Sequence, residues 1–314
     1  MEIPNDYFRI DPSVAGAIRA GRPVVALESA LLSHGLPSPT SWETVCELKE
    51  IVSGAGATPA VIGVVAGKIR VGLTNQEIRA LAEREDSSKA NLGNLAQVVC
   101  SGKWGGTTVS ATLRLACRAN IQVLATGGIG GIHRQFPGRF DVSADLSALS
   151  CSPLVVTCSG MKSLLDLPKT VELLETLGVP IIGFGTQELP AFYSPRSGLR
   201  LTHSTTSFAK IARVARCHWA LSGSSALLVT IPVSEESGVD FSEMETLLAQ
   251  AQEEADCQKI RGPHLTPFLL ERMDHLSGGR CLRANLALLK NNAAVAAEIS
   301  RFLSFSYLLP SEAL

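Results

Sequence analysis

Seven short runs of mostly apolar residues constrain the fold of this chain more than any other feature. They are residues 24–27, 60–66, 69–73, 122–126, 154–158, 179–184 and 226–231. Most show continuous Val, Ile and Leu rather than alternation with polar residues, which is typical of strands buried on both faces. We expect these runs to form a mainly parallel sheet, with a hairpin turn at Gly67-Lys68 between the second run and the third.

Amphipathic helical patterns fill the segments between these runs. The expected helices cover residues 41–53, 74–85, 107–119, 168–177, 241–259, 266–276 and 282–303. Thr74 and Glu77 have the spacing of a capping box, and Gly178 follows the helix at 168–177. The sequence has no low-complexity linker and no internal repeat. It therefore predicts an α/β fold: a single three-layer α/β/α domain over residues 1–314, with a helical C-terminal region.

Composition excludes several classes of protein. The net charge is −1 and aromatic residues are 5% of the chain, which argues against a nucleic-acid polymer as partner. The 8 cysteines show no CxxC spacing, so we expect buried free thiols rather than a zinc ribbon, as suits a reducing compartment. No apolar run approaches the ~18 residues of a membrane span, and the first residues lack a signal-peptide core. We expect a cytoplasmic protein that does not bind membranes.

Glu28 follows the first apolar run directly, and a glycine-rich segment follows the run at 122–126. The carboxyl ends of strands are where open α/β sheets bind ligands. The segment from Thr126 to His133 reads TGGIGGIH, and its glycines would let the backbone approach a ligand closely. It matches neither a dinucleotide fingerprint nor a P-loop. Taken alone, Glu28 is better explained as a solvated loop carboxylate, and the glycines as a structural turn.

Two further segments carry groups of chemical interest. In the segment FDVSADL, Ser143 is positioned to cap a short helix that ends at Leu149, whose free amides would hold a phosphate. Asp141 offers an oxygen ligand for a hard metal ion, although both acids of this segment could be ordinary caps. Lys162 follows the run at 154–158 in a segment of apolar and small residues. A buried lysine is a candidate for an imine-forming nucleophile, and a surface lysine is the alternative.

Together these segments resemble the pseudouridine-5'-phosphate glycosidase family, also called the indigoidine synthase A-like family. The matching strings run in order from about residue 22 to residue 301. They are ALESALLSHG, GGTTVSATLRLA, ATGGIGGIHR, FDVSADL, SGMKSLLDLPKTVELLETLGVP, ELPAFYSPRSG, TPFLLERM and LRANLALLKNNAAVAAEI. The resemblance implies a single α/β/α domain and a homotrimer.

The resemblance also implies a reaction, the reversible cleavage of pseudouridine 5'-phosphate by water into uracil and ribose 5-phosphate. The bond broken is a carbon–carbon glycosidic bond, so the usual scheme of two carboxylates has no leaving oxygen to protonate. An amine can instead attack the anomeric carbon and open the ribose ring, and the resulting iminium is an electron sink for carbon–carbon cleavage. By motif match Lys162 is this nucleophile and Glu28 is the proton donor.

The other site residues are implied by the same match. Asp141 corresponds to the position of a divalent metal, typically Mn2+. The substrate pocket would be formed by Lys89, Val109, Thr126, Ser143, Ala144, Asp145 and Asn285. Of these, we expect Lys89, Thr126, Ser143 and Asn285 to meet the phosphate.

One segment departs from the family pattern. After the pocket lysine the family usually has Ser-Arg-Arg-Asp-Leu from the second following residue, whereas this chain continues from Lys89 as Ala90-Asn91-Leu92-Gly93-Asn94-Leu95. Asn91 could still cap the following helix. The change would affect trimer contacts, phosphate affinity or substrate choice. The alternative function is a catalytically inactive sugar-phosphate or nucleotide-binding protein, which the intact Glu28 and Lys162 oppose. A generic Rossmann-type cofactor enzyme lacks its glycine fingerprint here.

Overall fold

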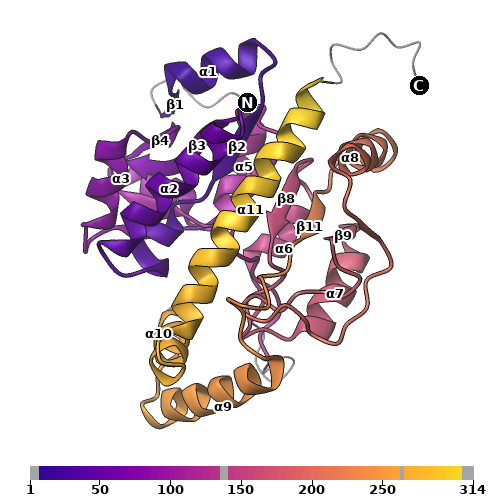
Figure 1. Ribbon diagram of the computed structural model, residues 1–314. Coiled ribbons are helices and arrows are strands. Elements are labelled where there is room, and N and C mark those ends of the chain that lie inside the picture. Colours follow the sequence, from indigo (N-terminus) through magenta and orange to yellow (C-terminus); the bar gives the residue numbers. More distant parts are fainter. Residues whose placement is uncertain (1–6, 135–140, 262–264, 306–314) are drawn as a thin grey trace.

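The computed structural model describes residues 7–134, 141–261 and 265–305, and within them one mixed sheet crosses the molecule (Figure 1). In spatial order its strands are β1 (Phe8–Ile10), β4 (Lys68–Val71), β3 (Thr58–Val65), β2 (Val24–Leu27), β7 (Val123–Ala125), β8 (Val155–Cys158), β11 (Leu227–Thr230), β9 (Ile181–Phe184) and β10 (Ser204–Thr205). From β3 to β10 all neighbouring strands are parallel. β4 runs antiparallel to β3. A side branch of β5 (Ser88–Ala90) and β6 (Gly105–Thr107) joins β3 through β6.

All seven expected strands are present, each within two residues of the predicted ends. In β2, β8 and β11 every residue is buried, as expected, whereas in the edge-side strand β4 buried Ile69 and Val71 alternate with exposed Lys68 and half-buried Arg70. The hairpin between β3 and β4 was predicted one residue too late. The turn is formed by Ala66 and Gly67, with φ values of 47° and 73°, and Lys68 already pairs with Val65. Positive φ at both central residues is typical of a type I′ turn.

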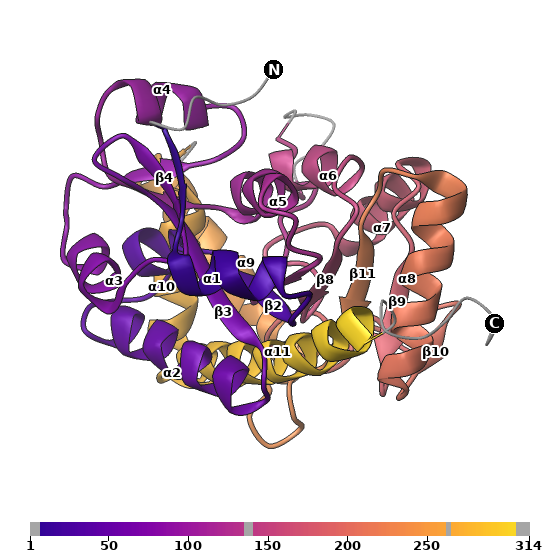
Figure 2. The same cartoon turned by 90° about the horizontal axis from the view of Figure 1, so that it is seen from above.

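The helices lie on both sides of this sheet, which confirms the three-layer α/β/α fold (Figure 2). They are α1 (Pro12–Arg19), α2 (Thr40–Gly54), α3 (Asn75–Ala82), α4 (Leu95–Cys100), α5 (Val109–Arg118), α6 (Ala144–Leu149), α7 (Leu167–Thr176), α8 (Phe208–Ser222), α9 (Phe241–Cys257), α10 (Leu265–Leu276) and α11 (Arg280–Phe305). α2 and α11 pack together on one side, and α5 and α6 pack together on the other. α11 runs across one face of the sheet and contacts β2, β7 and β8.

Local signals placed most helix ends correctly. The capping box is present, with the Thr74 N–H donating to Glu77 Oε2 at 2.9 Å and the Glu77 N–H donating to Thr74 Oγ1 at 3.2 Å. α5 begins two residues later than predicted because Thr107 belongs to β6. The expectation of buried thiols was wrong for most cysteines: all eight are free, but only Cys158 and Cys281 are buried. Among the described helices, none has the length and apolar character needed to cross a membrane.

The order of the strands positions the site. From β2 the chain moves to β3 on one side, whereas β7, which comes later, pairs with β2 on its other side. Connections therefore leave β2 and β7 in opposite directions. Open parallel sheets bind ligands beyond the carboxyl ends of strands at such a switch point.

Candidate functional site

Three adjacent strands deliver polar side chains to the switch point. Glu28 follows β2 and Thr126 follows β7, and the next strand, β8, leads into the loop that carries Lys162. The order β2-β7-β8 thus brings together residues that lie far apart in the sequence. These are two of the predicted catalytic residues and one predicted substrate-binding residue.

The Glu28 carboxyl is partly buried and directly hydrogen bonded. Thr126 is 2% exposed, and its hydroxyl donates to Glu28 Oε1. The loss of water around the Glu28 carboxyl raises its pKa, against the opposing effects of the Lys162 ammonium and the Thr126 hydroxyl. A carboxyl with a raised pKa keeps a larger protonated fraction near neutral pH, which a proton donor requires.

The backbone on both sides of Lys162 is fixed by the glycine-rich loop. The Lys162 N–H donates to the Ile129 carbonyl at 3.1 Å, and the Ile129 N–H donates to the Gly160 carbonyl at 3.1 Å. The Lys162 side chain is half-buried, and it is near enough to lower the pKa of Glu28. Its ammonium forms no hydrogen bond or ion pair with another described residue, so it is available to a ligand.

Lys89 brings a second positive charge to the same place from β5. Burial and the charge of Lys162 lower the pKa of the Lys89 ammonium. The segment from Asn91 to Leu95, which differs from the family pattern, supports the backbone of Lys89: the Asn94 side-chain amide donates to the Lys89 carbonyl at 3.1 Å. The expectation that Asn91 caps the following helix was wrong. Its Oδ1 accepts from the N–H groups of Gly93 and Asn94, so it closes the turn before α4 instead.

Asp145 links the glycine-rich loop to the start of α5. One carboxylate oxygen accepts from the Ser110 N–H at 2.9 Å and the other accepts from the Gly130 N–H at 2.8 Å. A Cβ at Gly130 would lie 2.3 Å from Ser143 Oγ, so only glycine fits there. Ser143 caps α6 as predicted, with its Oγ accepting from the Asp145 N–H at 3.2 Å. Phe140, the first residue of the predicted segment, lies outside the described residues.

Two cavities meet around the predicted catalytic residues. The larger, which we call the large cavity, has a volume of about 510 Å3. It is lined by Glu28, Ala30, Lys89, Asn91, Thr108, Val109, Ser110, Gly130, Gly131, His133, Asp141, Val142, Ser143, Ala144, Asp145, Lys162, Leu164 and Leu165. The other, the narrow cavity, has a volume of about 70 Å3. It is lined by Glu28, Ala30, Leu31, His34, Gly35, Lys89, Gly127, Gly128, Lys162, Phe192, Leu270, Asn285 and Leu289.

Glu28, Ala30, Lys89 and Lys162 belong to both cavities and form their junction. The remaining predicted residues divide between the two. The large cavity includes Val109, Asp141, Ser143, Ala144 and Asp145, whereas Asn285 lines only the narrow one. Thr126 lines neither cavity and lies behind Glu28. The four expected phosphate contacts therefore do not share one wall.

Asp141 offers a single oxygen site for a cation. Its carboxylate lines the large cavity and has no hydrogen bond to another described residue, while its carbonyl accepts from the His133 N–H at 3.0 Å. No group of three or more potential ligands among His, Cys, Asp and Glu occurs in the described residues. One carboxylate suits a hard divalent ion that takes its other ligands from water and phosphate oxygens.

Sequence reasoning missed two polar residues at the site. Asn292 is fully buried in α11, and its amide donates to the Thr126 carbonyl at 2.9 Å and to Ser159 Oγ at 3.2 Å. It thus ties the loops after β7 and β8 to α11. Its position seven residues after Asn285, on the same helix face, was the available signal. The second missed residue is His34, which lines the narrow cavity.

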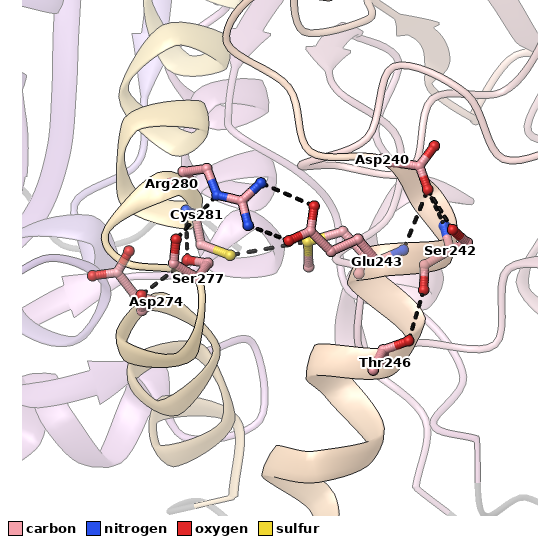
Figure 3. A network of polar contacts seen from close by, with 9 residues as sticks. Asp240, Ser242, Glu243, Thr246, Asp274, Ser277, Arg280 and Cys281 are labelled. Carbon is pink, nitrogen blue, oxygen red and sulfur yellow. Dashed lines mark hydrogen bonds and ion pairs between the residues drawn. The ribbon is translucent and has the colours of Figure 1, made fainter.

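A network of polar contacts joins the start of α11, the helix that carries Asn285, to α9 (Figure 3). Arg280, the first residue of α11, forms a bidentate ion pair with Glu243 of α9, one contact of which measures 2.9 Å. The Arg280 Nε–H also donates to the Ser277 carbonyl at 3.1 Å. Asp240 caps α9 through the Ser242 N–H at 2.8 Å. The ion pair thus joins α9 to the first residue of α11.

Comparisons with known proteins show the family of this chain. A family model described as "Indigoidine synthase A like protein" matches residues 13–302. The chain is 43% identical over 296 residues to the pseudouridine-5'-phosphate glycosidase of Caldanaerobacter subterraneus subsp. tengcongensis, covering 94% of this chain and 96% of that one. It is 44% identical over 294 residues to the enzyme of the same name from Myxococcus xanthus, covering 93% and 97%.

Two solved structures are similar over almost the whole chain. One is the prealnumycin C-glycosynthase AlnA in complex with ribulose 5-phosphate, with a TM-score of 0.90 and 35% identity, covering 97% of this chain and 99% of that one. The other is an indigoidine synthase A-like protein from Thermotoga maritima, with a TM-score of 0.86 and 38% identity, covering 95% and 97%.

Proposed function

The chain belongs to the indigoidine synthase A-like family, and from that membership we propose that it is a pseudouridine-5'-phosphate glycosidase. It would cleave the carbon–carbon glycosidic bond of pseudouridine 5'-phosphate reversibly, giving uracil and ribose 5-phosphate. The observation that carries the proposal is the meeting of Glu28 and Lys162 at the junction of the two cavities. An amine beside a carboxyl of raised pKa is the pair that ring opening of the ribose needs.

The first step opens the ribose ring. The neutral amine of Lys162 forms a bond to the anomeric carbon while the bond from that carbon to the ring oxygen breaks. The protonated Glu28 carboxyl gives its proton to the departing ring oxygen, which becomes a hydroxyl. Lys162 then carries the sugar carbon covalently, with the uracil ring still attached to that carbon.

The second step breaks the carbon–carbon bond. The Glu28 carboxylate left by the first step takes a proton from the alkylated Lys162 nitrogen, which regains its lone pair. The electron pair of the carbon–carbon bond then goes to C5 of uracil, which takes the proton from Glu28, while the lone pair of the Lys162 nitrogen forms the carbon–nitrogen double bond of an iminium. Uracil leaves. Water then adds to the iminium carbon, and ribose 5-phosphate is released as the lysine amine is restored.

The residues that line the two cavities suit different halves of the substrate. The large cavity combines the Lys89 ammonium, the Ser143 hydroxyl and the start of α5 at Val109, which suit a phosphate. The narrow cavity combines apolar side chains such as Leu289 with the Asn285 amide, which suits a base. The reacting carbon lies between them, where both cavities are bounded by Lys162.

Removing the phosphate from the substrate should weaken binding strongly. A phosphate held by Lys89 and the α5 amides is worth roughly several kcal/mol in a partly buried site. We expect unphosphorylated pseudouridine to have a specificity constant at least about 100-fold lower than that of pseudouridine 5'-phosphate. Steady-state release of uracil from the two compounds measures this, and similar specificity constants would contradict it.

We also propose that Asp141 holds a divalent ion such as Mn2+ against the phosphate. When bound, such an ion supplies positive charge that offsets the charge of the phosphate oxygens. Activity should disappear on chelation and return with Mn2+, and Asp141→Asn should weaken Mn2+ binding about tenfold or more, as titration calorimetry would show. Full activity after exhaustive chelation would exclude a required ion.

Thr126 should lower the pKa of the proposed proton donor, Glu28. Its hydroxyl bond favours the charged form of Glu28, so Thr126→Val, which keeps the shape, should raise the pKa of that carboxyl further. Because the donor is lost as pH rises through this pKa, the alkaline limb of the rate profile should move to higher pH. An unchanged limb would show that another group controls it.

A direct assay tests the proposed activity. Purified protein is incubated with pseudouridine 5'-phosphate and Mn2+, and free uracil is measured together with ribose 5-phosphate. Formation of both in equal amounts supports the proposal. Binding of the substrate with no uracil released would favour the alternative, a sugar-phosphate-binding protein without catalysis.

The remaining features rest on the family resemblance. We propose a homotrimer in the cytoplasm with the whole chain as one domain and with no nucleic acid or membrane among its partners. The eight free cysteines fit a reducing compartment, and the unbroken sheet from β1 to β10 fits one domain. Light scattering of the purified protein gives the number of subunits.

A further inference from the structure

His34 faces the reaction site from a segment that the proposed chemistry does not use. The chain after Glu28 forms a π-helical turn, η1 (Leu31–Gly35), whose C-terminal part places His34 on the wall of the narrow cavity. Single π-helical turns occur often at functional sites. The same wall includes the catalytic pair, so His34 lies beside the reacting groups but belongs only to the narrow cavity.

The imidazole has one nitrogen engaged and one available. Its Nδ1 lies 2.7 Å from Ser33 Oγ, which fixes the ring orientation. No hydrogen bond joins Nε2 to another described residue. Burial lowers the pKa of His34, and the positive charge of Lys89 lowers it further. The ring is therefore neutral near pH 7, and its Nε2 offers one neutral hydrogen bond rather than a charge.

Phe192 forms an aromatic wall of the same cavity. It is buried, and its backbone is held at a φ of 60°, which is uncommon for a bulky residue and is often found at functional sites. The Phe192 N–H donates to the Ser159 carbonyl at 2.8 Å. Its ring packs on Gly128, where a Cβ would come within 2.6 Å of it. A fixed aromatic ring beside neutral polar groups suits a planar, uncharged ring with a polar edge.

We propose that His34 is a specificity-determining residue for the pyrimidine, holding a carbonyl or N–H of its edge through Nε2 beside the Phe192 ring. This inference rests on the proposed function, which requires uracil next to Lys162. Uracil is neutral and carries both donors and acceptors around its ring, so a neutral imidazole matches it in either tautomer. The phosphate is better matched by the large cavity, where the Ser143 hydroxyl and the start of α5 accompany the shared lysines.

The synthetic direction tests this inference, because uracil and ribose 5-phosphate are then separate substrates. In His34→Ala the KM for uracil should rise about tenfold, while the KM for ribose 5-phosphate stays within about twofold. Borohydride trapping of ribose 5-phosphate on the protein without uracil should proceed as in the wild type. His203→Ala, which changes an exposed histidine far along the chain, serves as the control.

Two conservative variants separate recognition from a structural role. The amide nitrogen of glutamine reaches the position of Nε2, whereas that of asparagine reaches the position of Nδ1. We expect His34→Gln to keep most of the affinity for uracil and His34→Asn to lose it, with both proteins folded by circular dichroism. Equal effects of the two, an unchanged KM for uracil, or an equal rise for both substrates would overturn the assignment. A wild-type protein that traps ribose 5-phosphate but never joins it to uracil would instead contradict the proposed function.

Discussion

Lys162→Arg should reduce turnover below detection. The imine requires a neutral primary amine that forms two bonds to carbon, and a guanidinium is permanently charged and cannot do so. The positive charge at the junction remains, so binding of ribose 5-phosphate should persist. The expected result is loss of uracil release together with retained binding of ribose 5-phosphate by calorimetry.

Borohydride reduction identifies the nucleophile directly. During turnover of the wild type it should leave a reduced ribose-phosphate adduct on Lys162, which peptide mass mapping locates. Lys89→Arg should weaken substrate binding but keep the adduct, since Lys89 lines the junction without forming the imine. Lys210→Arg, at an exposed position of α8, should behave as the wild type. An adduct on Lys89, or full activity in Lys162→Ala, would show that the wrong lysine was assigned.

Glu28→Gln should slow the reaction by about 100-fold or more. Glutamine keeps the size of the side chain and can still accept a hydrogen bond from the Thr126 hydroxyl, but it has no transferable proton. In the wild type the protonated donor is present below the raised pKa of Glu28 and is lost as pH rises through it. The alkaline limb of the kcat profile should therefore be present in the wild type and absent from the residual activity of the variant.

Glu77→Gln is the matched control for this change. Glu77 belongs to the capping box of α3, outside both cavities, so its replacement should affect stability without changing the pH profile. A rate for Glu28→Gln within tenfold of the wild type would mean that another group, or water, delivers the proton to the ring oxygen.

The sheet was predictable because its signal is local. Strands such as β8 and β11 consist of consecutive apolar residues, and that run alone indicates burial on both faces. β6 has the sequence Gly-Gly-Thr and carries no such signal, although it is fully buried. The π-helical turn η1 was also missed, because a turn of five residues is too short to show a period.

The candidate site residues were predicted through the resemblance, but their contacts could not be predicted. Thr126 was expected to meet the phosphate, whereas the structure pairs it with Glu28, which lies 98 residues away in the sequence. Such a pair depends on the strand order β2-β7, which no local pattern encodes. Asn292 shows the opposite case: its seven-residue spacing from Asn285 was visible in the sequence, and only its role as an anchor for two loops required the structure.

The proposed division of the substrate between two cavities that share four residues has a consequence for how such an enzyme changes during evolution. In that assignment the bond-making groups occupy the shared part, while the base and the phosphorylated sugar each contact a separate set of residues. Mutations of residues that line only the narrow cavity can therefore change which base is joined to the sugar, without changing the lysine or the residues proposed to bind the sugar phosphate. The same scaffold is thereby open to both degradative and biosynthetic use, and redesign for new C-glycosides would begin at those residues.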